Sequence, residues 1–384
     1  MRPGACLFLM LVSTATSAAQ ATRGQTSRRF TGPCASADPV YAKIANATGG
    51  QQYLLRGSEI EKSGAVMEAK VLHSANILFA SGVLRKGEPR DFQVPVDSTI
   101  QSVAFSVTVE CKESIAVWRP SGDVVTPGGS AGFRDTEMVA GRILTVTRPE
   151  TGPWRVRVSG TGGYSVSVLA KSDLDLIGFD FVRLGGRPGH EGLFPIPGQP
   201  TSPDQMARAR LSGPFQTATF KLLSEAGDFL QTLTLTTTDR GEFIGNLRLP
   251  GQPFRVAVEG TDERGLAYQR VLAHRMELQT IEITTLTPVE ELKAGTTTKM
   301  SFQVRNLGTA GAFQATVVWL GRNFMRTPAP MRLALPAEGA VAIEADVDVP
   351  ADATPGTEVT ISVAVTRKTP PASENGLALS VAIR

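Results

Sequence analysis

The stretch PWRVRVSGTGGYSVSV, residues 153–168, decides the fold class of this chain of 384 residues. Apolar residues alternate with polar ones on both sides of its glycine-rich centre: Trp154, Val156 and Val158 before it, and Tyr164, Val166 and Val168 after it. A period of two is typical of a half-buried β-strand, because successive side chains point to opposite faces of the sheet. The centre, residues 159–163, predicts the turn of a hairpin between two strands.

The same alternation recurs from about residue 90 to the end of the chain, in short segments that glycine and proline separate. Further examples are Phe254–Val258, Phe313–Trp319, Ile343–Val349 and Val359–Val365. This pattern predicts antiparallel sheets that bury one face. We therefore expect a mainly β protein built from tandem antiparallel β-sandwiches.

A helical period precedes the β pattern, in residues 38–83. A capping residue followed by proline starts a first helix, and a pair of glycines ends it. Ser58 and Glu61 form a capping box ahead of a second helical pattern, which extends to Leu78. Between the two helices, Gln51–Leu55 predicts a short strand.

Composition predicts six segments along the chain. The Pro/Gly-rich residues 185–205 are either a linker or a long loop inside the second sandwich, and a further junction lies near Thr284. The segments are a signal peptide (1–21), a flexible leader (22–37), a helix–strand–helix segment (38–83) and three β-sandwiches (84–175, 176–284 and 285–384).

Residues 1–21 predict export from the cell. Arg2 gives them a positive start, Ala5–Val12 form a short apolar core, and small residues suit cleavage after Ala19 or Ala21. No later stretch approaches the roughly 20 apolar residues of a transmembrane helix. We expect a secreted, extracellular protein with no transmembrane segment.

Of the three cysteines, Cys6 falls in the expected signal peptide, which leaves Cys34 and Cys111 in the mature chain. An oxidising compartment permits a disulfide between these two. Two separately buried thiols are the alternative, because pairing needs Cα atoms within about 7 Å. Neither cysteine has a second Cys or a His at the spacing of a zinc site, so we expect no cofactor.

Charge excludes one class of partner. Lysine and arginine number 39 against 36 acidic residues, a net charge of +3, and the basic residues are scattered singly. Nucleic-acid binding needs basic residues clustered on one face. We therefore expect no nucleic-acid partner.

Several stretches resemble parts of hemicentins and related extracellular proteins that contain a von Willebrand factor A domain. DPVYAKIANATGGQQYLLRGSEIEK resembles the helix–strand–helix that closes such an A domain. The β-domain that follows it in the family is described as galactose-binding-like, and immunoglobulin-like segments come next. The matching stretches are residues 38–62 (A domain), 100–107, 115–125 and 152–181 (galactose-binding-like), and 218–235 and 253–270 (immunoglobulin-like). The final hundred residues resemble a further immunoglobulin-like or fibronectin-like domain.

One departure limits what this resemblance implies. The metal-ion-dependent adhesion site of an A domain opens with D-x-S-x-S, and the chain contains no such motif. The family's metal-dependent adhesion is therefore not expected here. The strand at Gln51–Leu55 would also lack a central sheet to pair with. Either the chain is a truncated gene product, or the helices pack on the neighbouring sandwich as a cap.

The histidines and the glycine-rich stretches give little support for catalysis. None of the three histidines, His73, His190 and His274, has a partner at zinc-ligand spacing, and we expect His73 to be a surface or capping residue. The letters G-x-S-x-G occur at residues 128–132, within a Pro/Gly-rich stretch, and no phosphate-binding glycine loop occurs. A Ser-His-Asp triad can assemble from distant residues, so a secreted hydrolase or its accessory module stays an alternative. We expect a non-enzyme.

Four residues are candidates for binding or modification. Trp118 is the best aromatic platform for a glycan, with core packing as the alternative, whereas Trp154 and Trp319 are expected in the core. Asp173 and Asp175, at strand spacing, are weak calcium ligands or a polar strand edge. The triplet at Asn46 is an N-glycosylation acceptor or a chance match.

Together these features predict a secreted, non-catalytic protein of the adhesion or matrix type, whose sandwiches bind an extracellular protein or glycan. The alternatives are a glycan-binding module in residues 84–175 and the hydrolase described above.

Overall fold

The computed structural model describes residues 34, 39–126, 132–239, 241–287, 289 and 291–384. The predicted signal peptide and all of the predicted leader except Cys34 lie outside them. Strands dominate the described residues, so the prediction of a mainly β fold is confirmed. The chain divides into two compact units: Met1–Phe179, Arg208–Gly245 and Pro253–Met276 form the first, and Asp180–Ala207, Asn246–Gln252 and Glu277–Arg384 form the second. No described helix has the length and hydropathy needed to cross a membrane.

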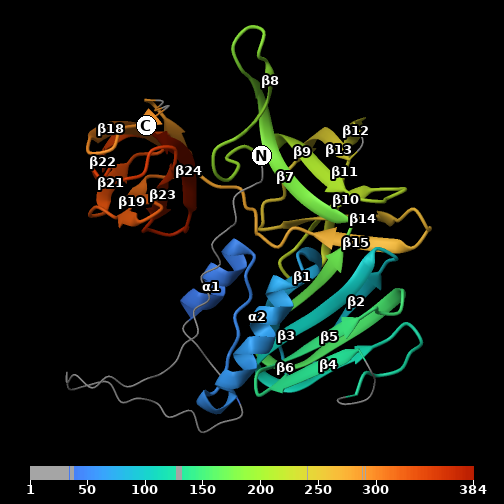
Figure 1. Cartoon of the computed structure of the whole chain (residues 1–384). Coiled ribbons are helices and arrows are strands. Elements are labelled where there is room, and N and C mark those ends of the chain that lie inside the picture. The colour runs from blue at the N-terminus through green and yellow to red at the C-terminus, as the bar shows by residue number, and fades with distance from the viewer. Residues whose placement is uncertain (1–33, 35–38, 127–131, 240, 288, 290) are drawn as a thin grey trace, which may run out of the picture. The chain divides into compact units, whose positions relative to one another are not determined.

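The first unit begins with a six-stranded antiparallel sheet (Figure 1). Its order is β1-β6-β3-β5-β4, and β2 also pairs with β6. The strands are β1 (Ala75–Leu84), β2 (Arg90–Val96), β3 (Ile100–Trp118), β4 (Phe133–Met138), β5 (Gly141–Thr147) and β6 (Gly152–Ser172).

The predicted hairpin at residues 159–163 is wrong, because both halves of that stretch belong to the single long strand β6. One half of β6 pairs with β2 and the other with β1. The register between β6 and β3 shifts at three places, and two of these, after Val109 and after Lys112, lie at the bend. Gly160 lies where a Cβ would approach the Cys111 carbonyl oxygen to 2.3 Å, so the close approach needs glycine. The glycines therefore bend a strand where the sequence pattern predicted a turn.

Bending brings the two halves of this sheet face to face around one apolar core. Trp154, fully buried on one half, lies 5.4 Å between ring centroids from Phe105 on the other. Valines from both halves complete the same cluster. A sandwich thus arises from two long folded strands, β3 and β6, rather than from separate short ones.

The helical segment differs from its prediction at three points, the first being that the Arg56 N–H donates to Glu59 Oε2 in place of the expected Ser58–Glu61 capping box. Its helices are α1 (Pro39–Thr48), the 3₁₀ helix η1 (Gly57–Lys62) and α2 (Ser63–Val71). The second helix therefore ends at Val71 and not at Leu78, because residues 75–84 form β1, whose continuous apolar run fits a helix or a buried strand equally well. Gln51–Leu55 is not a strand; the Gln51 side chain instead donates to the carbonyls of Ser106 and Ser165.

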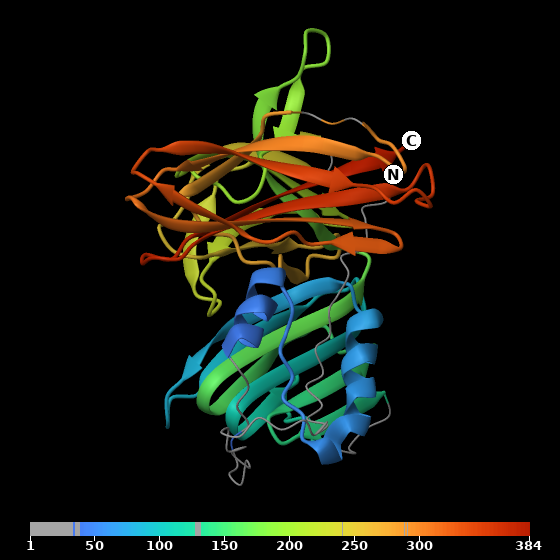
Figure 2. The same cartoon turned by 90° about the vertical axis from the view of Figure 1, so that its left-hand side faces the viewer.

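Helix α2 packs on the first sheet, which is the cap arrangement foreseen as one alternative (Figure 2). Val66 and Ala69 of α2 contact Ala104, Met138 and Ile143. Ahead of the helix, the Tyr53 hydroxyl lies 2.7 Å from Ser106 Oγ. The helical segment therefore covers apolar surface on the sheet that follows it.

Nine strands in two sheets follow. The four-stranded sheet has the order β11-β10-β14-β15 and the five-stranded sheet β12-β13-β9-β7-β8. Phe220 of β10 and Phe243 of β13 join the two sheets at 4.9 Å between ring centroids. The strands are β7 (Asp175–Gly185), β8 (Gly192–Pro195), β9 (Asp204–Ser212), β10 (Thr219–Leu223), β11 (Phe229–Leu233), β12 (Thr236–Asp239), β13 (Glu242–Arg248), β14 (Arg255–Thr261) and β15 (Ala267–Val271).

The Pro/Gly-rich residues 185–205 contain strand β8, which pairs with β7. Farther along them, the Gln199 N–H donates to Asn375 Oδ1 at 2.9 Å, and Asn375 Nδ2 donates to Ile281 O at 2.7 Å. Asn375 is buried. Within the second unit, one amide side chain thus ties the predicted linker to the last sandwich.

The last sandwich consists of a three-stranded sheet, β16-β18-β22, and a six-stranded sheet, β17-β24-β23-β19-β20 with β21 also on β19. Its core contains Trp319, as predicted, and a single apolar cluster joins the two sheets. The strands are β16 (Ile281–Thr285), β17 (Glu291–Leu292), β18 (Thr297–Asn306), β19 (Gly311–Gly321), β20 (Phe324–Arg326), β21 (Met331–Leu335), β22 (Ala340–Asp348), β23 (Glu358–Arg367) and β24 (Glu374–Ile383).

Candidate functional site

Trp118, the predicted glycan platform, lies at the end of β3 and is half-buried. Its register partner on β6 is Arg155, whose guanidinium carbon lies 4.1 Å from the indole centroid. Arg157 approaches the same ring at 5.7 Å. Cation–π contacts thus occupy the indole surface that a sugar would stack on.

The same outer surface holds an exposed ion pair. Arg157 Nε and Nη2 donate to the two carboxylate oxygens of Asp91 at 2.7 and 2.6 Å. The hydrogen bond and charge of Arg157 lower the pKa of Asp91. In the outer-face cluster, defined as Asp91, Trp118, Arg155 and Arg157, Arg157 therefore pairs with Asp91 while Arg155 lies over the Trp118 ring.

Asp173 and Asp175 do not form the pair of parallel side chains that the sequence predicts. Asp173 lies in the bend between β6 and β7, outside either strand, and is exposed, whereas Asp175 is the first residue of β7 and is partly buried. Burial raises the pKa of Asp175, which opposes the ionised form that calcium prefers. Among the described residues no group of three His, Cys, Asp or Glu side chains could hold a metal ion.

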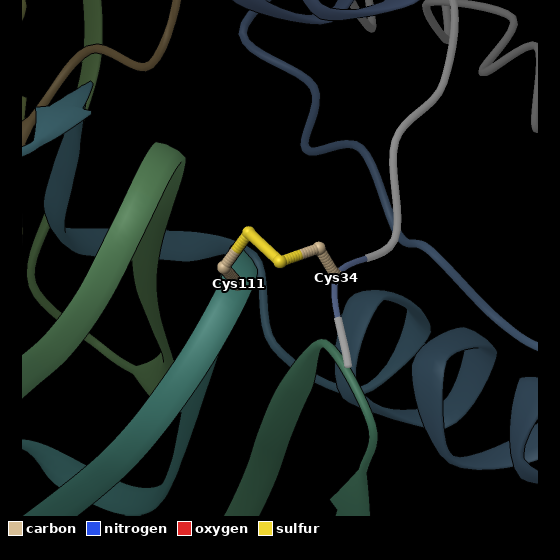
Figure 3. The surroundings of a disulfide bond; sticks show 2 residues. All are labelled: Cys34 and Cys111. Carbon is tan, nitrogen blue, oxygen red and sulfur yellow. A yellow bond between two sulfur atoms is a disulfide. The ribbon is translucent and has the colours of Figure 1, made fainter. Parts of the chain in front are cut away.

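Cys34 and Cys111 form a disulfide that ties the start of the described chain to β3 (Figure 3). The bond closes a loop with a sequence separation of 77 residues. Cys111 lies where β3 shifts register beside the bend of β6. The cross-link thus joins the polypeptide that leads into the helices to the folded-over part of the first sheet.

Removing this disulfide should destabilise the first unit. We expect Cys111→Ser to lower the free energy of unfolding by about 2–4 kcal/mol, because the cross-link restricts a long loop in the unfolded chain. Urea unfolding of the oxidised protein and the variant measures the difference. Equal midpoints, or two free thiols in the native protein by alkylation and mass spectrometry, would contradict the pairing.

The predicted glycosylation residue and two of the three histidines are surface features. Asn46 lies within α1 and is partly buried, and Thr48 of the same triplet donates its hydroxyl hydrogen to the Ile44 carbonyl. His190 and His274 are exposed.

His73 is buried, so the expectation of a surface residue is wrong, whereas the capping expectation holds. Its Nδ1 lies 2.9 Å from the carbonyl of Ala69 in the last turn of α2, and its Nε2 lies 3.0 Å from Ser102 Oγ on β3. This Ser–His pair has a backbone carbonyl where a catalytic triad has a carboxylate. The imidazole consequently fastens a helix end to the sheet.

The stability of this attachment should depend on pH. Burial lowers the pKa of His73, with Lys171 adding to the shift and Glu68 opposing it. As the pH falls, His73 is therefore protonated in the unfolded chain before it is protonated in the folded protein. The stability that neutral His73 contributes above about pH 6.5 is lost as the pH falls toward its pKa in the folded protein. We expect the stability difference between the native protein and His73→Gln to shrink from pH 7.5 to pH 5.5 in urea unfolding. A constant difference would refute this.

An ionic network that the sequence did not reveal joins the first sheet to the β10–β15 region within the first unit. Arg270 on β15 donates from Nη1 to Asp97 Oδ2 at 2.8 Å, and both side chains are fully buried. The remaining Arg270 donors reach the Leu174 carbonyl at 2.8 Å and Ser172 Oγ at 2.7 Å. Asp97 also accepts from the Thr99 N–H at 3.0 Å. Every charged group is thus paired, as burial requires.

A second buried carboxylate lies beside this network. Asp262, at the turn between β14 and β15, accepts from the Ser98 N–H at 2.9 Å and from the N–H of Leu266 at 2.9 Å. Gly265 in this turn has a φ of 80°, a conformation that favours glycine. In the sequence, the feature that could have indicated this network is Arg270, because its position in the strand period places it on the same inward face of β15 as Tyr268.

Comparisons with known proteins match two parts of the chain to domain families. Residues 76–173 match the hemicentin galactose-binding domain-like family, and residues 282–382 match the VWA7 Ig-like domain. The chain is 25% identical over 248 residues to Hemicentin-1 of Mus musculus and 24% identical over 246 residues to Hemicentin-1 of Homo sapiens. These alignments cover 60% of the chain and 4% of each relative, so the chain spans a small fraction of their length.

Solved structures are similar only at a low level. A DUF4785 family protein from Legionella pneumophila is 12% identical with a TM-score of 0.31, covering 78% of this chain and 91% of that one. A beta-glucosidase from Listeria innocua is 16% identical with a TM-score of 0.21, covering 27% of this chain and 16% of that one. Scores of this size support no conclusion about the function of this chain.

Proposed function

We propose that this hemicentin-like protein is an extracellular, non-catalytic protein of the adhesion or matrix type, in which β-sandwich domains present contact surfaces to partners. The observation that carries the proposal is the match of residues 76–173 to the hemicentin galactose-binding domain-like family. A second domain-family match, at residues 282–382, is consistent with a chain of serial binding modules. Fold alone does not assign a ligand, so the partner is left to experiment.

The buried network of Asp97 and Arg270 supports a mechanical role for the first unit. A salt bridge with both side chains fully buried resists separation of the first sheet from β15. Hydrogen bonds from Arg270 to Ser172 and from Thr99 to Asp97 reinforce it. Paired modules that move as one body would transmit force and hold binding loops at a set spacing. Such behaviour suits a spacer in a matrix better than it suits an enzyme.

Cell attachment tests this proposal directly. We expect cells to attach to a surface coated with the full chain and not to one coated with the heat-unfolded chain. The same assay is run on Arg157→Ala, an exposed substitution in the outer-face cluster. A circular dichroism spectrum of this variant shows whether any loss of cell attachment comes from the lost contact or from misfolding. Attachment no greater than to albumin, over several cell types, would remove the adhesion proposal.

Glycan binding through residues 84–175 is the narrower alternative. Because Arg155 stacks on the Trp118 ring, we expect no neutral sugar on a glycan array to bind in a manner that Trp118→Ala abolishes. A sugar whose binding is lost in that variant, with the fold retained, would establish the alternative. For the hydrolase alternative, labelling of Ser102 by a fluorophosphonate probe would be the corresponding positive result.

A further inference from the structure

The last sandwich leaves one strand of its smaller sheet without a neighbour. The sheet order is β16-β18-β22, which makes β22 an edge. The Val349 N–H donates to the Thr296 carbonyl at 3.1 Å. In an antiparallel pair, alternate residues direct their backbone groups toward the neighbouring strand, so Val347, Ala345 and Ile343 also form their backbone hydrogen bonds with β18. The backbone N–H and C=O groups of Ala342, Glu344 and Asp346 consequently point toward the open edge.

A groove runs along this edge. It has a volume of about 470 Å³ and is lined by β22, by the loop Arg326–Met331 and by Val317 and Trp319 of β19. The Trp319 indole donates from Nε1 to the Asp348 carbonyl at 3.0 Å, which independently places that carbonyl on the open side of β22. The groove therefore offers apolar surface next to unpaired strand edge.

Charge on the exposed face of β22 is predominantly negative. The carboxylates of Glu344, Asp346 and Asp348 alternate along it. One cation of the neighbouring strand faces them: Lys299 Nζ donates to Glu344 at 3.1 Å, and this bond raises the Lys299 pKa. On the groove side, Arg326 adds a second cation. Three carboxylates against these two cations leave the edge with a surplus of negative charge.

These features distinguish between kinds of strand that could pair with the edge. A second copy of β22 in antiparallel register would place carboxylates opposite carboxylates, which is destabilising. A strand with Lys or Arg at alternate positions would instead oppose the carboxylates with positive charge. Its intervening side chains would point toward the groove beside Ala345 and Trp319, where apolar residues fit.

We propose that the β22 edge binds an extended segment of a partner protein in which basic residues alternate with apolar ones. Binding adds a strand to the sheet: backbone hydrogen bonds hold the segment, and side chains on its two faces select it. The inference concerns the last sandwich only and does not rest on the adhesion proposal. Cell attachment can fail while the peptide binds, and the reverse.

Fluorescence anisotropy of a labelled peptide in which lysine and valine alternate tests this inference on the full chain. We expect saturable binding that weakens several-fold between 50 and 300 mM salt, because the opposing charges are exposed. A peptide of alternating glutamate and valine should not bind. Methylation of every second backbone nitrogen of the lysine peptide should abolish binding, since it removes the strand hydrogen bonds.

Variants separate strand addition from simple charge attraction. Asp346→Lys should weaken binding at least about tenfold through like-charge repulsion, and Ala342→Pro should do the same with no charge change, because proline removes an edge N–H that β18 does not use. Glu358→Lys, the same reversal on an exposed residue of β23, should keep the affinity. Circular dichroism checks that each variant is folded. No saturable binding at millimolar peptide, or unchanged affinity in folded Ala342→Pro, would overturn the proposal.

Discussion

Replacing Arg270 by methionine is expected to destabilise the first unit by about 3–5 kcal/mol, because it leaves the Asp97 carboxylate buried without its cation. The two side chains are fully buried and 2.8 Å apart, so water cannot replace the lost partner. Urea unfolding monitored by circular dichroism measures the change. A loss below about 1 kcal/mol would mean that the pair is solvated in solution.

Two comparisons make this result specific to burial. The exposed pair Asp91–Arg157 has similar geometry, and Arg157→Met should destabilise the protein far less than Arg270→Met, as is usual for exposed ion pairs. The double variant Asp97→Asn with Arg270→Met should recover part of the loss, because no buried charge is left unpaired. Additive losses in the double variant would contradict coupling between the two residues.

Trp154→Ala is expected to lower the free energy of unfolding by about 3–5 kcal/mol, through lost apolar burial and the cavity left behind. Trp154 is completely buried, contacts Phe105, and donates from Nε1 to the Glu150 carbonyl at 2.8 Å. It therefore supports the contact between the two halves of the bent sheet. Thermal or urea unfolding gives the magnitude.

Trp118→Ala is the matched control, since the same side chain is removed from a half-buried site on the same domain. Its expected cost is about 1 kcal/mol, mainly the stacking with Arg155. Equal losses for the two tryptophans would show that burial does not distinguish them. In that case the packing between the two halves of the sheet would not contribute as described.

Prediction from the sequence succeeded where neighbouring residues carry the information. Alternation placed Trp154 and Trp319 in the core, because inward and outward positions follow from the strand period alone. It failed at Gly160, since a glycine-rich stretch fits either a tight turn or a bend, and long-range pairing with β2 and β1 selects the bend. It failed again at residues 75–84, where an apolar run has no period that separates helix from strand.

The same limit applies to the individual sites: the sequence identifies candidate residues but not which of them meet in space. Cys34 and Cys111 were recognised as potential partners, but their distance in space was not available from their separation of 77 residues. The pairing of Asp97 with Arg270 was harder still to predict, because no short-range sequence pattern relates a residue just after β2 to a residue on β15. Neither could the sequence tell that Arg155 covers Trp118, since the two lie on different strands.

The sequence by itself thus determined that this protein is mainly β, which side chains of most strands face inward, and that it resembles hemicentins. Only the tertiary structure decided that β3 and β6 fold over to make one sandwich, that helix α2 caps it, and that a buried salt bridge joins it to the next strands. The physical reason is range: strand period and capping are properties of adjacent residues, whereas register, bends and charge pairing depend on the free energy of contacts between distant ones.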